Sequence, residues 1–337
     1  MLLVTGGAGF IGSNFVHYVI DNFPKLKLVN LDLLTYAGSK HNLSKLQNNE
    51  RHIFIEGDIN DRELIEKLFQ KYSFDTVINF AAESHVDRSI IDPQIFLRTN
   101  ILGTQTLLDA ALKHFKEDPE NRRCRKFKQG KKFIQISTDE VYGALGQTGL
   151  FTENTPLAPN SPYSATKASA DLIVRAYFKT YGLPINITRC SNNYGPYQFP
   201  EKFIPLIIHR CMNDKKIPVY GDGLQVRDWL HVEDHCRAIV SVWQKGIVGE
   251  VYNIGGNNEK ANIEIARLIL QEMGKPESLI DYVEDRLGHD KRYAIDSSKI
   301  KNKLAWQARY SFKEGLRDTV RWYLNNTQWL ETVMNKK

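Results

Sequence analysis

Long apolar runs, disulfide-type cysteine patterns and low-complexity segments are absent from this 337-residue sequence. Its four cysteines, at positions 124, 190, 211 and 236, show no C-x-x-C spacing, which favours reduced thiols in a cytosol over a disulfide framework. The same spacing gives no basis for a metal site. No predominantly apolar stretch reaches the roughly 18 residues of a transmembrane helix, and the first residues lack a basic and apolar leader. We therefore expect a cytoplasmic protein with no metal and no membrane contact.

The net charge of +6 is concentrated in one segment. Residues 114–132 carry eight Lys or Arg against three Asp or Glu, a surplus of five, so the rest of the chain is nearly balanced. We therefore predict a solvated surface loop here and no nucleic-acid partner. An acidic or phosphate-bearing partner for this segment stays open.

A strand, a glycine turn and a helix open the chain. An apolar run over 1–5 leads into GGAGFIG at 6–12, and the predicted helix continues to about residue 22. Gly6 allows a tight turn, Gly9 lets the backbone approach a diphosphate, and Gly12 lets the helix pack closely on the strand. Free N–H groups and the helix dipole favour negative charge at this N-terminus. The pattern predicts a dinucleotide site.

Two acidic residues at predicted strand ends indicate which dinucleotide binds. The strand at 27–31 ends at Asp32, twenty residues after Gly12, where a carboxylate binds a ribose diol and repels a 2′-phosphate. NAD is therefore favoured over NADP; the alternative is that Asp32 only starts the next turn. Asp58, at the end of a third strand over 52–59, is expected near the adenine.

Strands and helices alternate over the first 190 residues. Later elements of this half are predicted as helices at 61–72, 99–113 and 163–181 and strands at 76–80, 131–136 and 185–189. Such alternation predicts an α/β fold with a doubly wound parallel sheet, residues 1–190 forming a Rossmann NAD-binding domain. Residues 191–337 are expected to form mainly a smaller α/β substrate lobe, with some chain returning to the first domain. Its predicted pieces are strands at 216–223 and 225–230 and helices near 232–245, 262–273 and 312–324.

The reactive side chains converge on two stretches. The strand at 131–136 leads into Thr138, Asp139 and Glu140, so it delivers a hydroxyl and two carboxyls to the sheet edge. Tyr163 and Lys167 are four residues apart on one face of the next helix. Together these groups can move a proton and a hydride. The alternative for the two acids is an exposed turn.

The loop AAESHVD at 81–87 is the third candidate stretch. The small Ala81 and Ala82 let the backbone lie close to a cofactor, and Ser84 can hydrogen-bond a ligand. His85 is either catalytic or a structural or substrate-lining side chain.

Five stretches carry a family pattern. They are AAESHVDRS at 81–89, STDEVYG at 137–143, SNNYGPYQ at 191–198, VRDW at 226–229 and RLGHD at 286–290. With the glycine turn and the Tyr-x-x-x-Lys pair, they make the chain resemble the extended short-chain dehydrogenase/reductase family, and within it the dTDP-glucose 4,6-dehydratases, over nearly its whole length. The acidic pair at 139–140 is the narrowest signal, because related sugar epimerases usually lack it. Leu287 stands where the family commonly has proline, and 114–132 looks like an insertion.

The resemblance implies a hydro-lyase of deoxysugar (rhamnose-type) biosynthesis. It would convert dTDP-glucose into dTDP-4-keto-6-deoxyglucose and water, with tightly bound NAD reduced and reoxidised in each turnover. Tyr163 would take the proton of the 4-hydroxyl, and Thr138 would bind the 4-oxygen. Lys167 would hold the nicotinamide ribose and, with the nicotinamide charge, lower the pKa of the phenol by about three units. Glu140 would remove the C5 proton and Asp139 would protonate the departing 6-hydroxyl.

The same resemblance, with the motifs above, predicts the binding residues. Cofactor contacts are expected from Gly6, Gly9, Phe10, Ile11, Gly12, Asp32, Leu33, Thr35, Asp58, Ile59, Phe80, Ala81, Ala82, Ser84, Thr99, Tyr163, Lys167 and Asn193. Substrate contacts are expected from Ser84, His85, Thr138, Asn192, Lys202, Phe203, Pro218, Val219, Tyr220, Arg227, Asn262, Asp285, Arg286, His289 and Tyr293. Arg227 is the strongest physically, because a guanidinium matches phosphate geometry.

Two other functions stay open. A UDP-sugar 4,6-dehydratase or 4-epimerase acts on the same bond framework, and the motifs do not identify the base. A non-catalytic NAD-binding sensor is disfavoured because Thr138, Tyr163 and Lys167 are all present. The family also implies a homodimer through a four-helix interface of the helices near 99–113 and 165–180.

Overall fold

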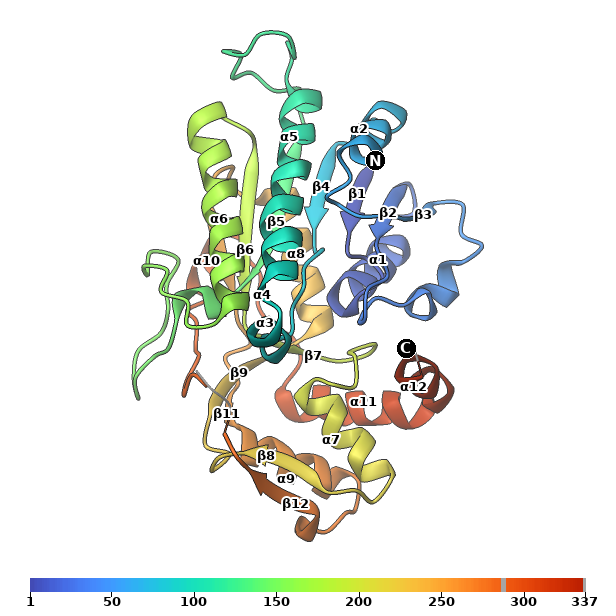
Figure 1. Cartoon of the computed structure of the whole chain (residues 1–337), viewed down its shortest axis with the longest axis vertical. Coiled ribbons are helices and arrows are strands. Elements are labelled where there is room, and N and C mark those ends of the chain that lie inside the picture. Colours follow the sequence, from blue (N-terminus) through green and yellow to red (C-terminus); the bar gives the residue numbers. More distant parts are fainter. Residues whose placement is uncertain (286–288, 336–337) are drawn as a thin grey trace.

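A seven-stranded sheet forms the centre of the computed structural model, which describes residues 1–285 and 289–335 (Figure 1). Its strand order is β10-β6-β5-β4-β1-β2-β3, and every neighbouring pair is parallel. The strands are β1 (Leu2–Thr5), β2 (Leu28–Asp32), β3 (His52–Glu56), β4 (Thr76–Asn79), β5 (Lys132–Thr138), β6 (Ile185–Cys190) and β10 (Val251–Ile254). The predicted doubly wound parallel sheet is confirmed. Its edge strand β10 was not among the predicted strands.

Helices cover both faces of this sheet because successive strand residues point to opposite sides. Leu3 of β1 packs with apolar residues of three helices on one face, whereas Leu2 and Val4 pack with those of two helices on the other. The first face carries α2 (Arg62–Lys71), α5 (Thr104–Phe115) and α6 (Pro162–Tyr181); the second carries α1 (Phe10–Asn22) and α8 (Val232–Lys245).

A smaller group of elements lies beyond the carboxyl ends of the strands (Figure 1). It contains a three-stranded sheet in the order β11-β9-β7 and the parallel pair β12-β8. Apolar side chains of four helices, including Ile207, Ile269, Leu316 and Leu330, form its core around Trp229. The elements are β7 (Asn192–Tyr194), α7 (Phe203–Met212), β8 (Ile217–Tyr220), β9 (Val226–His231), β11 (Glu259–Ala261), α9 (Asn262–Glu272), β12 (Ile280–Val283), α11 (Phe312–Asn325) and α12 (Thr327–Met334).

The helix predicted at 99–113 differs from the observed one. The chain makes two short helices and then a π-helical segment before α5 begins. The π-helical segment turns Asn100 into the interior, where its side chain exchanges two hydrogen bonds with the backbone of Glu83. The two short helices are α3 (Val86–Ile91) and α4 (Pro93–Phe96), and the π-helical segment is η2 (Leu97–Gly103). The other short helices of the described chain are η1 (Lys40–Leu46), η3 (Asp139–Tyr142), η4 (Glu277–Leu279) and α10 (Ser298–Leu304).

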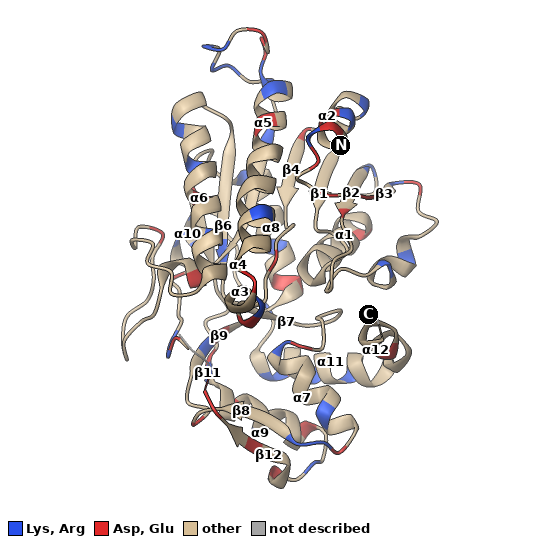
Figure 2. Ribbon diagram, in the orientation of Figure 1, with Lys and Arg blue, Asp and Glu red and all other residues tan. Residues whose placement is uncertain are grey.

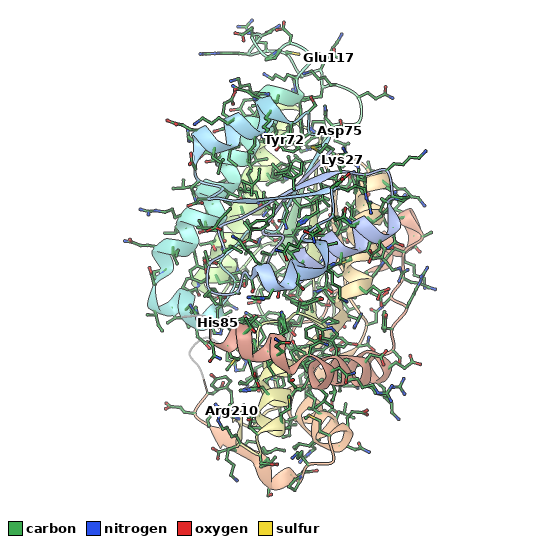
Figure 3. All side chains as sticks on the ribbon, turned by 90° about the vertical axis from the view of Figure 1, so that its right-hand side faces the viewer. Lys27, Tyr72, Asp75, His85, Glu117 and Arg210 are labelled. Carbon is green, nitrogen blue, oxygen red and sulfur yellow. The ribbon has the colours of Figure 1, made fainter. Side chains whose placement is uncertain are left out.

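The basic segment 114–132 projects between α5 and β5 as an exposed excursion, with its cations clustered in Figure 2. Figure 3 shows Glu117 of this segment at the opposite end of the molecule from Arg210 of α7, with His85 between them. Some of its cations bind backbone: Arg125 Nη2 donates to the Lys179 carbonyl at 3.1 Å. No helix in the described part of the chain is long and apolar enough to cross a membrane.

Candidate active site

A cavity of about 300 Å³ opens where β1, β2, β4, β5 and β6 end. Open α/β sheets bind their ligands at this edge. Every residue predicted to contact the cofactor lines it, as do the five predicted catalytic residues. Some lining residues were not predicted: Leu31, Tyr36, Ala37, Gly38, Gly57, Glu83, Ile136, Ser137, Cys190, Ser191, Gln198, Phe199 and Glu201.

The glycine turn forms one wall of the cavity and leaves no room for a side chain at Gly6 or Gly12. Gly6 has φ +70°, and a Cβ there would lie 2.5 Å from the Ala81 nitrogen. A Cβ on Gly12 would lie 2.2 Å from the Gly6 carbonyl oxygen. Helix α1 begins after Gly9 without any side-chain cap. Its first N–H groups are thus open to an anion, which is the arrangement that a dinucleotide diphosphate requires.

Asp32 ends β2 with both carboxylate oxygens held in place. Oδ2 accepts a hydrogen bond from the Ala8 N–H and Oδ1 from the Leu34 N–H, each at 2.8 Å. The carboxylate therefore stays fixed on the cavity wall, where it fits a ribose diol and repels a 2′-phosphate. Asp58 also lines the cavity, and its Oδ1 accepts from the Asn60 backbone at 2.8 Å. The residues present fit NAD.

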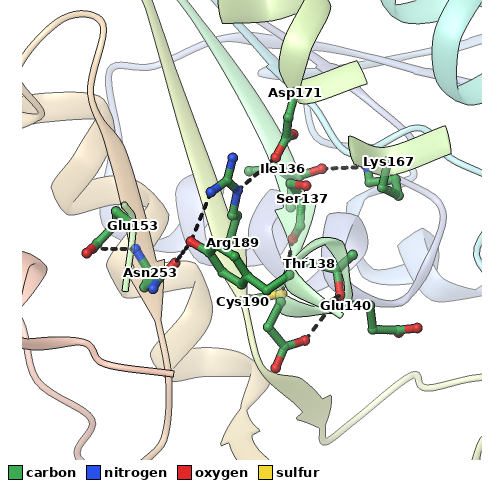
Figure 4. A network of polar contacts seen from close by, with 12 residues as sticks. Ile136, Ser137, Thr138, Glu140, Glu153, Lys167, Asp171, Arg189, Cys190 and Asn253 are labelled. Atoms are coloured by element: carbon green, nitrogen blue, oxygen red, sulfur yellow. Dashed lines mark hydrogen bonds and ion pairs between the residues drawn. The ribbon is translucent and has the colours of Figure 1, made fainter. Parts of the chain in front are cut away.

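Helix α6 brings the phenol and the amine to the cavity. Ser161 caps the helix through Ser164, and Pro162 occupies the first turn, so α6 starts one residue before Tyr163. Lys167 follows one helical turn later and donates from Nζ to the Ile136 carbonyl at 2.7 Å (Figure 4). Both side chains are buried.

The end of β5 supplies the hydroxyl and the two acids. Thr138 Oγ1 lies 3.3 Å from Asp139 Oδ1 and accepts from the Glu140 N–H at 3.3 Å. Asp139 is only 1% exposed. Burial, followed by the like charges of Glu140 and Asp228, raises the pKa of Asp139 well above its usual range. Burial thus favours the protonated form of Asp139, and Glu140 lies beside it on the cavity wall.

Tyr163 and Lys167 do not form an activated pair by themselves. Burial, and then the charge of Glu140, raises the pKa of Tyr163 well above 10. Burial lowers the pKa of Lys167. In the protein alone, burial and then the charge of Glu140 therefore oppose the lowering of the phenol pKa that is expected from Lys167.

The predicted substrate residues fall into two groups. Ser84, Thr138, Asn192 and Lys202 line the cavity. The rest lie outside its lining, at the start of α3, on strands and helices of the smaller group, or in the segment that follows β12. They are, in this order, His85; Phe203, Pro218, Val219, Tyr220, Arg227 and Asn262; and Asp285, His289 and Tyr293. Arg286, like Leu287, lies outside the described residues.

Several of these outer residues meet one another. The guanidinium of Arg227 lies 4.4 Å from the ring centre of Tyr293. His289 Nδ1 lies 2.6 Å from Asp285 Oδ1, and its ring stands edge-on to Tyr220. Val219 is fully buried in the core, so only its backbone can meet a ligand.

Others of this group hold the backbone in place. Phe203 begins α7 and stacks on Trp229, while Asn262 begins α9 and donates its N–H to the Gln225 carbonyl. Pro218 lies in β8.

Three further residues connect the two parts of the molecule at the cavity mouth. The Arg88 guanidinium lies 3.8 Å from the ring centre of Tyr36 and 3.6 Å from Glu201 Oε2. His85 Nε2 lies 3.8 Å from the same oxygen. Tyr36 and Glu201 belong to irregular loops, so no helix or strand period marks them. Their association depends on contacts between segments more than 100 residues apart.

Fold and cavity define a NAD-dependent enzyme of the short-chain dehydrogenase/reductase type. A family model described as GDP-mannose 4,6 dehydratase matches residues 3–319, and the chain therefore belongs to that family. This agrees with the resemblance drawn from the motifs. Similar proteins nevertheless carry another substrate in their names.

A dTDP-glucose 4,6-dehydratase of Xanthomonas campestris pv. campestris is 54% identical over 342 residues, covering 99% of this chain and 95% of that protein. The crystal structure of a dTDP-glucose 4,6-dehydratase from Bacillus anthracis in complex with NAD has a TM-score of 0.89 and 50% identity, covering 98% of this chain and 99% of that one. The crystal structure of a dTDP-glucose 4,6-dehydratase from Streptomyces venezuelae, with NAD and TYD bound, has a TM-score of 0.91 and 45% identity. The match covers 98% of this chain and 99% of that one.

Proposed function

We propose that this protein binds NAD and dehydrates dTDP-glucose to dTDP-4-keto-6-deoxyglucose in deoxysugar biosynthesis. The observation that carries the proposal is Asp139, an acid buried next to a second carboxyl on the wall of a dinucleotide cavity, where burial raises its pKa. An enzyme that only epimerises a sugar has no hydroxyl to protonate and expel. Relatives that match almost the whole chain support the same reaction.

The first step is oxidation at C4 of the sugar. NAD, when bound, accepts the hydride and brings a positive charge to the cavity. Tyr163 takes the proton of the 4-hydroxyl, and the Thr138 hydroxyl binds the 4-oxygen. Lys167, held on the Ile136 carbonyl, orients the nicotinamide ribose and adds a positive charge next to the phenol.

The second step expels water across C5 and C6. The new 4-ketone makes the C5 proton acidic, and Glu140 takes that proton. Asp139 gives its own proton to the 6-hydroxyl, so the C6–O bond breaks and water leaves as the C5–C6 double bond forms. A proton then returns to C5 while the hydride returns to C6. Asp139 needs to start neutral and Glu140 charged, which the burial of Asp139 favours.

We assign the binding of the sugar nucleotide to both groups of predicted residues. Ser84, Asn192 and Lys202 contact the sugar side from the cavity wall. Arg227, with the Tyr220–His289 surface beyond the cavity, receives the diphosphate and the base. Residues 1–190 then act as the NAD-binding domain and 191–337 mainly as the nucleotide-sugar lobe, with β10 returned to the first sheet.

We also propose that the protein is a cytoplasmic homodimer. Leu102 and Leu172 are each more than half exposed, near the start of α5 and on α6. Pairing of α5 and α6 between two copies buries these side chains in a four-helix interface. All four cysteines are free, as in a reducing compartment. A monomer in sedimentation at micromolar concentration contradicts the dimer.

The test is an assay of the purified protein with dTDP-glucose and no added NAD. We expect one water to be lost from the sugar nucleotide, read by mass spectrometry, and an alkaline absorbance from the keto product. UDP-glucose and GDP-mannose, run in parallel, identify the preferred base and sugar. Asp139→Asn combined with Glu140→Gln removes dehydration and leaves NAD bound. Recovery of dTDP-glucose with all its oxygens refutes the assignment.

A further inference from the structure

A buried ion pair lies directly behind the reactive helix face. Arg189 of β6 donates from Nε to Asp171 Oδ2 of α6 at 2.9 Å, and both side chains are buried (Figure 4). Moving two charges out of water is costly, and a buried pair is weak evidence for stability as such. Connecting β6 to α6 therefore does not by itself explain why a buried ion pair is present here.

Lys167 supplies that reason. It lies four residues before Asp171, so the two side chains leave the same face of α6. The Lys167 ammonium is buried and donates a hydrogen bond to the neutral Ile136 carbonyl. Asp171 Oδ1 is buried and has no hydrogen-bond partner among the described residues. The Asp171 carboxylate thus binds one buried cation, Arg189, and lies one helical turn from a second, Lys167, with one of its oxygens uncommitted.

We infer that Asp171 is a positioning residue, whose carboxylate is shared between Arg189 and Lys167 and keeps the Lys167 ammonium charged beside Tyr163. The inference rests on the proposed function only in the role given there to Lys167. Asp171 itself does not line the cavity and touches no reacting atom.

The electrostatic effects of Asp171 on Lys167 and Arg189 agree with this role. Burial lowers the pKa of Lys167, and the charges of Asp171 and then Cys190 oppose that effect. Burial also opposes the charge on Arg189, but Asp171 and Tyr142 outweigh it and raise the Arg189 pKa. The titratable groups around the ammonium are Tyr163 and Asp171 from α6, Arg189 and Cys190 from β6, and Asp139 and Glu140 from the turn after β5.

The far end of the network fixes Arg189 in place. Its Nη1 donates to the Tyr142 hydroxyl at 2.9 Å, and this hydroxyl donates to Asn253 Oδ1 at 2.7 Å. The Asn253 N–H in turn donates to Glu153 Oε1 at 2.9 Å (Figure 4). The Arg189 guanidinium is therefore held at both ends, by Asp171 and by Tyr142, and stays in place at the Asp171 carboxylate. Tyr142→Phe removes an uncharged part of the network and serves as the matched control.

The test is the titration of Lys167 in the intact NAD-loaded protein. Lysine labelled with ¹³C at Cε is followed by NMR against pH, and the Lys167 signal is identified by its loss in Lys167→Arg. We expect Asp171→Asn to lower the Lys167 midpoint by about 1–3 units, the usual effect of removing a nearby opposite charge. The alkaline limb of the pH–activity profile moves down by the same amount, while Tyr142→Phe leaves both unchanged. An unchanged midpoint in Asp171→Asn overturns the inference.

Two further variants keep the test decisive if Asp171→Asn unfolds. The variant Arg189→Gln keeps the Asp171 carboxylate but removes its ion-pair partner. The double variant Asp171→Asn with Arg189→Gln replaces the ion pair by two neutral amide side chains that can still hydrogen-bond each other. The Lys167 midpoint should be lower in the double variant than in Arg189→Gln, and equal midpoints overturn the inference. Because the titration does not depend on turnover, a wild-type protein that fails to dehydrate dTDP-glucose refutes the proposed function alone.

Discussion

Asn100 donates from Nδ2 to the hydroxyl of Thr166 at 2.9 Å, and this contact connects the π-helical segment to the helix that carries Tyr163 and Lys167. The same amide group binds both backbone groups of Glu83 in the loop after β4. One side chain thus sets the spacing between the cofactor-side loop and the reactive helix. The two sides of the cavity cannot shift independently while it is present.

Replacing this residue should therefore affect both stability and the cavity. Asn100→Ala leaves the Glu83 N–H and C=O buried without their partner, and each such group costs about 1–3 kcal/mol. We expect a loss of about 2–5 kcal/mol in the free energy of unfolding, measured with urea, together with weaker NAD retention. Asn48→Ala, on the surface, is the matched control. Equal stability of the two variants contradicts the role given to Asn100.

Asp139 should lower stability at neutral pH while it serves the reaction. Its pKa is raised in the folded protein, so the fold binds the proton more tightly than the unfolded chain, and stability falls as pH rises above about 4 until the folded pKa is passed. Asp139→Asn removes this dependence. Between about pH 4 and the folded pKa of Asp139, we expect the free energy of unfolding of Asp139→Asn, relative to wild type, to grow by up to about 1.4 kcal/mol per pH unit. Turnover of this variant should fall by about 10²- to 10⁴-fold.

Unfolding at pH 5 and at pH 8 measures this difference. The exposed Asp281→Asn provides the matched control, since the same chemical change there should leave both turnover and the pH dependence of stability as they are in wild type. A stability gain that is identical at both pH values argues against a buried neutral Asp139.

His235 should make the fold sensitive to acid. Asn193 donates from Nδ2 to the Ser191 carbonyl, so its Oδ1 faces His235 Nδ1 at 2.9 Å and that nitrogen carries the proton. Burial lowers the His235 pKa to about 3. In the unfolded chain His235 therefore binds a proton near pH 6.5, whereas in the folded protein it stays neutral to a much lower pH. The stability that is present above pH 6.5 is lost as the pH falls, by up to about 5 kcal/mol near pH 3.

The variant His235→Asn tests this relationship. This variant should be less stable than wild type at pH 7, because the Asn193 contact is disturbed. The difference in the free energy of unfolding between variant and wild type (the stability gap) should narrow as the pH is lowered. Urea unfolding from pH 4 to 7 measures the gap. His41→Asn on the surface should show no such convergence. A gap that stays constant with pH excludes a neutral buried His235.

The glycine turn should separate folding from cofactor binding. A Cβ on Gly12 meets the Gly6 carbonyl oxygen at 2.2 Å, whereas one on Gly9 meets the same oxygen at 3.3 Å. Gly12→Ala should therefore distort the turn itself and lose both NAD and about 1–3 kcal/mol of stability, as overpacking does. Gly9→Ala should keep most of the stability and weaken NAD retention, measured by absorbance after gel filtration. Gly146→Ala, with open space around it, is the control.

Sequence reasoning succeeded where a local pattern carries the structure. The glycine turn, Asp32 at the end of β2 and the helix predicted at 163–181, which is α6 (Pro162–Tyr181), are each determined by a local pattern. All predicted cofactor residues line one cavity for that reason. Their individual roles in binding and catalysis stay predictions.

The rest depends on contacts between distant segments, which no period in the sequence records. In the π-helical segment, Asn100 reaches back seventeen residues to bind Glu83. Helix α7 contains Pro205, which suggests a loop until its place in the first turn is known. The Asp171–Arg189 pair joins two elements that are each ordinary by themselves.

Strand β10 has a consequence for how the chain is made. It comes sixty residues after its neighbour β6, once β7, α7, β8, β9 and α8 have been synthesised. Until residue 254 leaves the ribosome, β6 has an unpaired edge, which is a template for contact with other chains. The nascent protein is therefore most prone to aggregate during this interval, and an early stop between 191 and 250 should yield insoluble fragments.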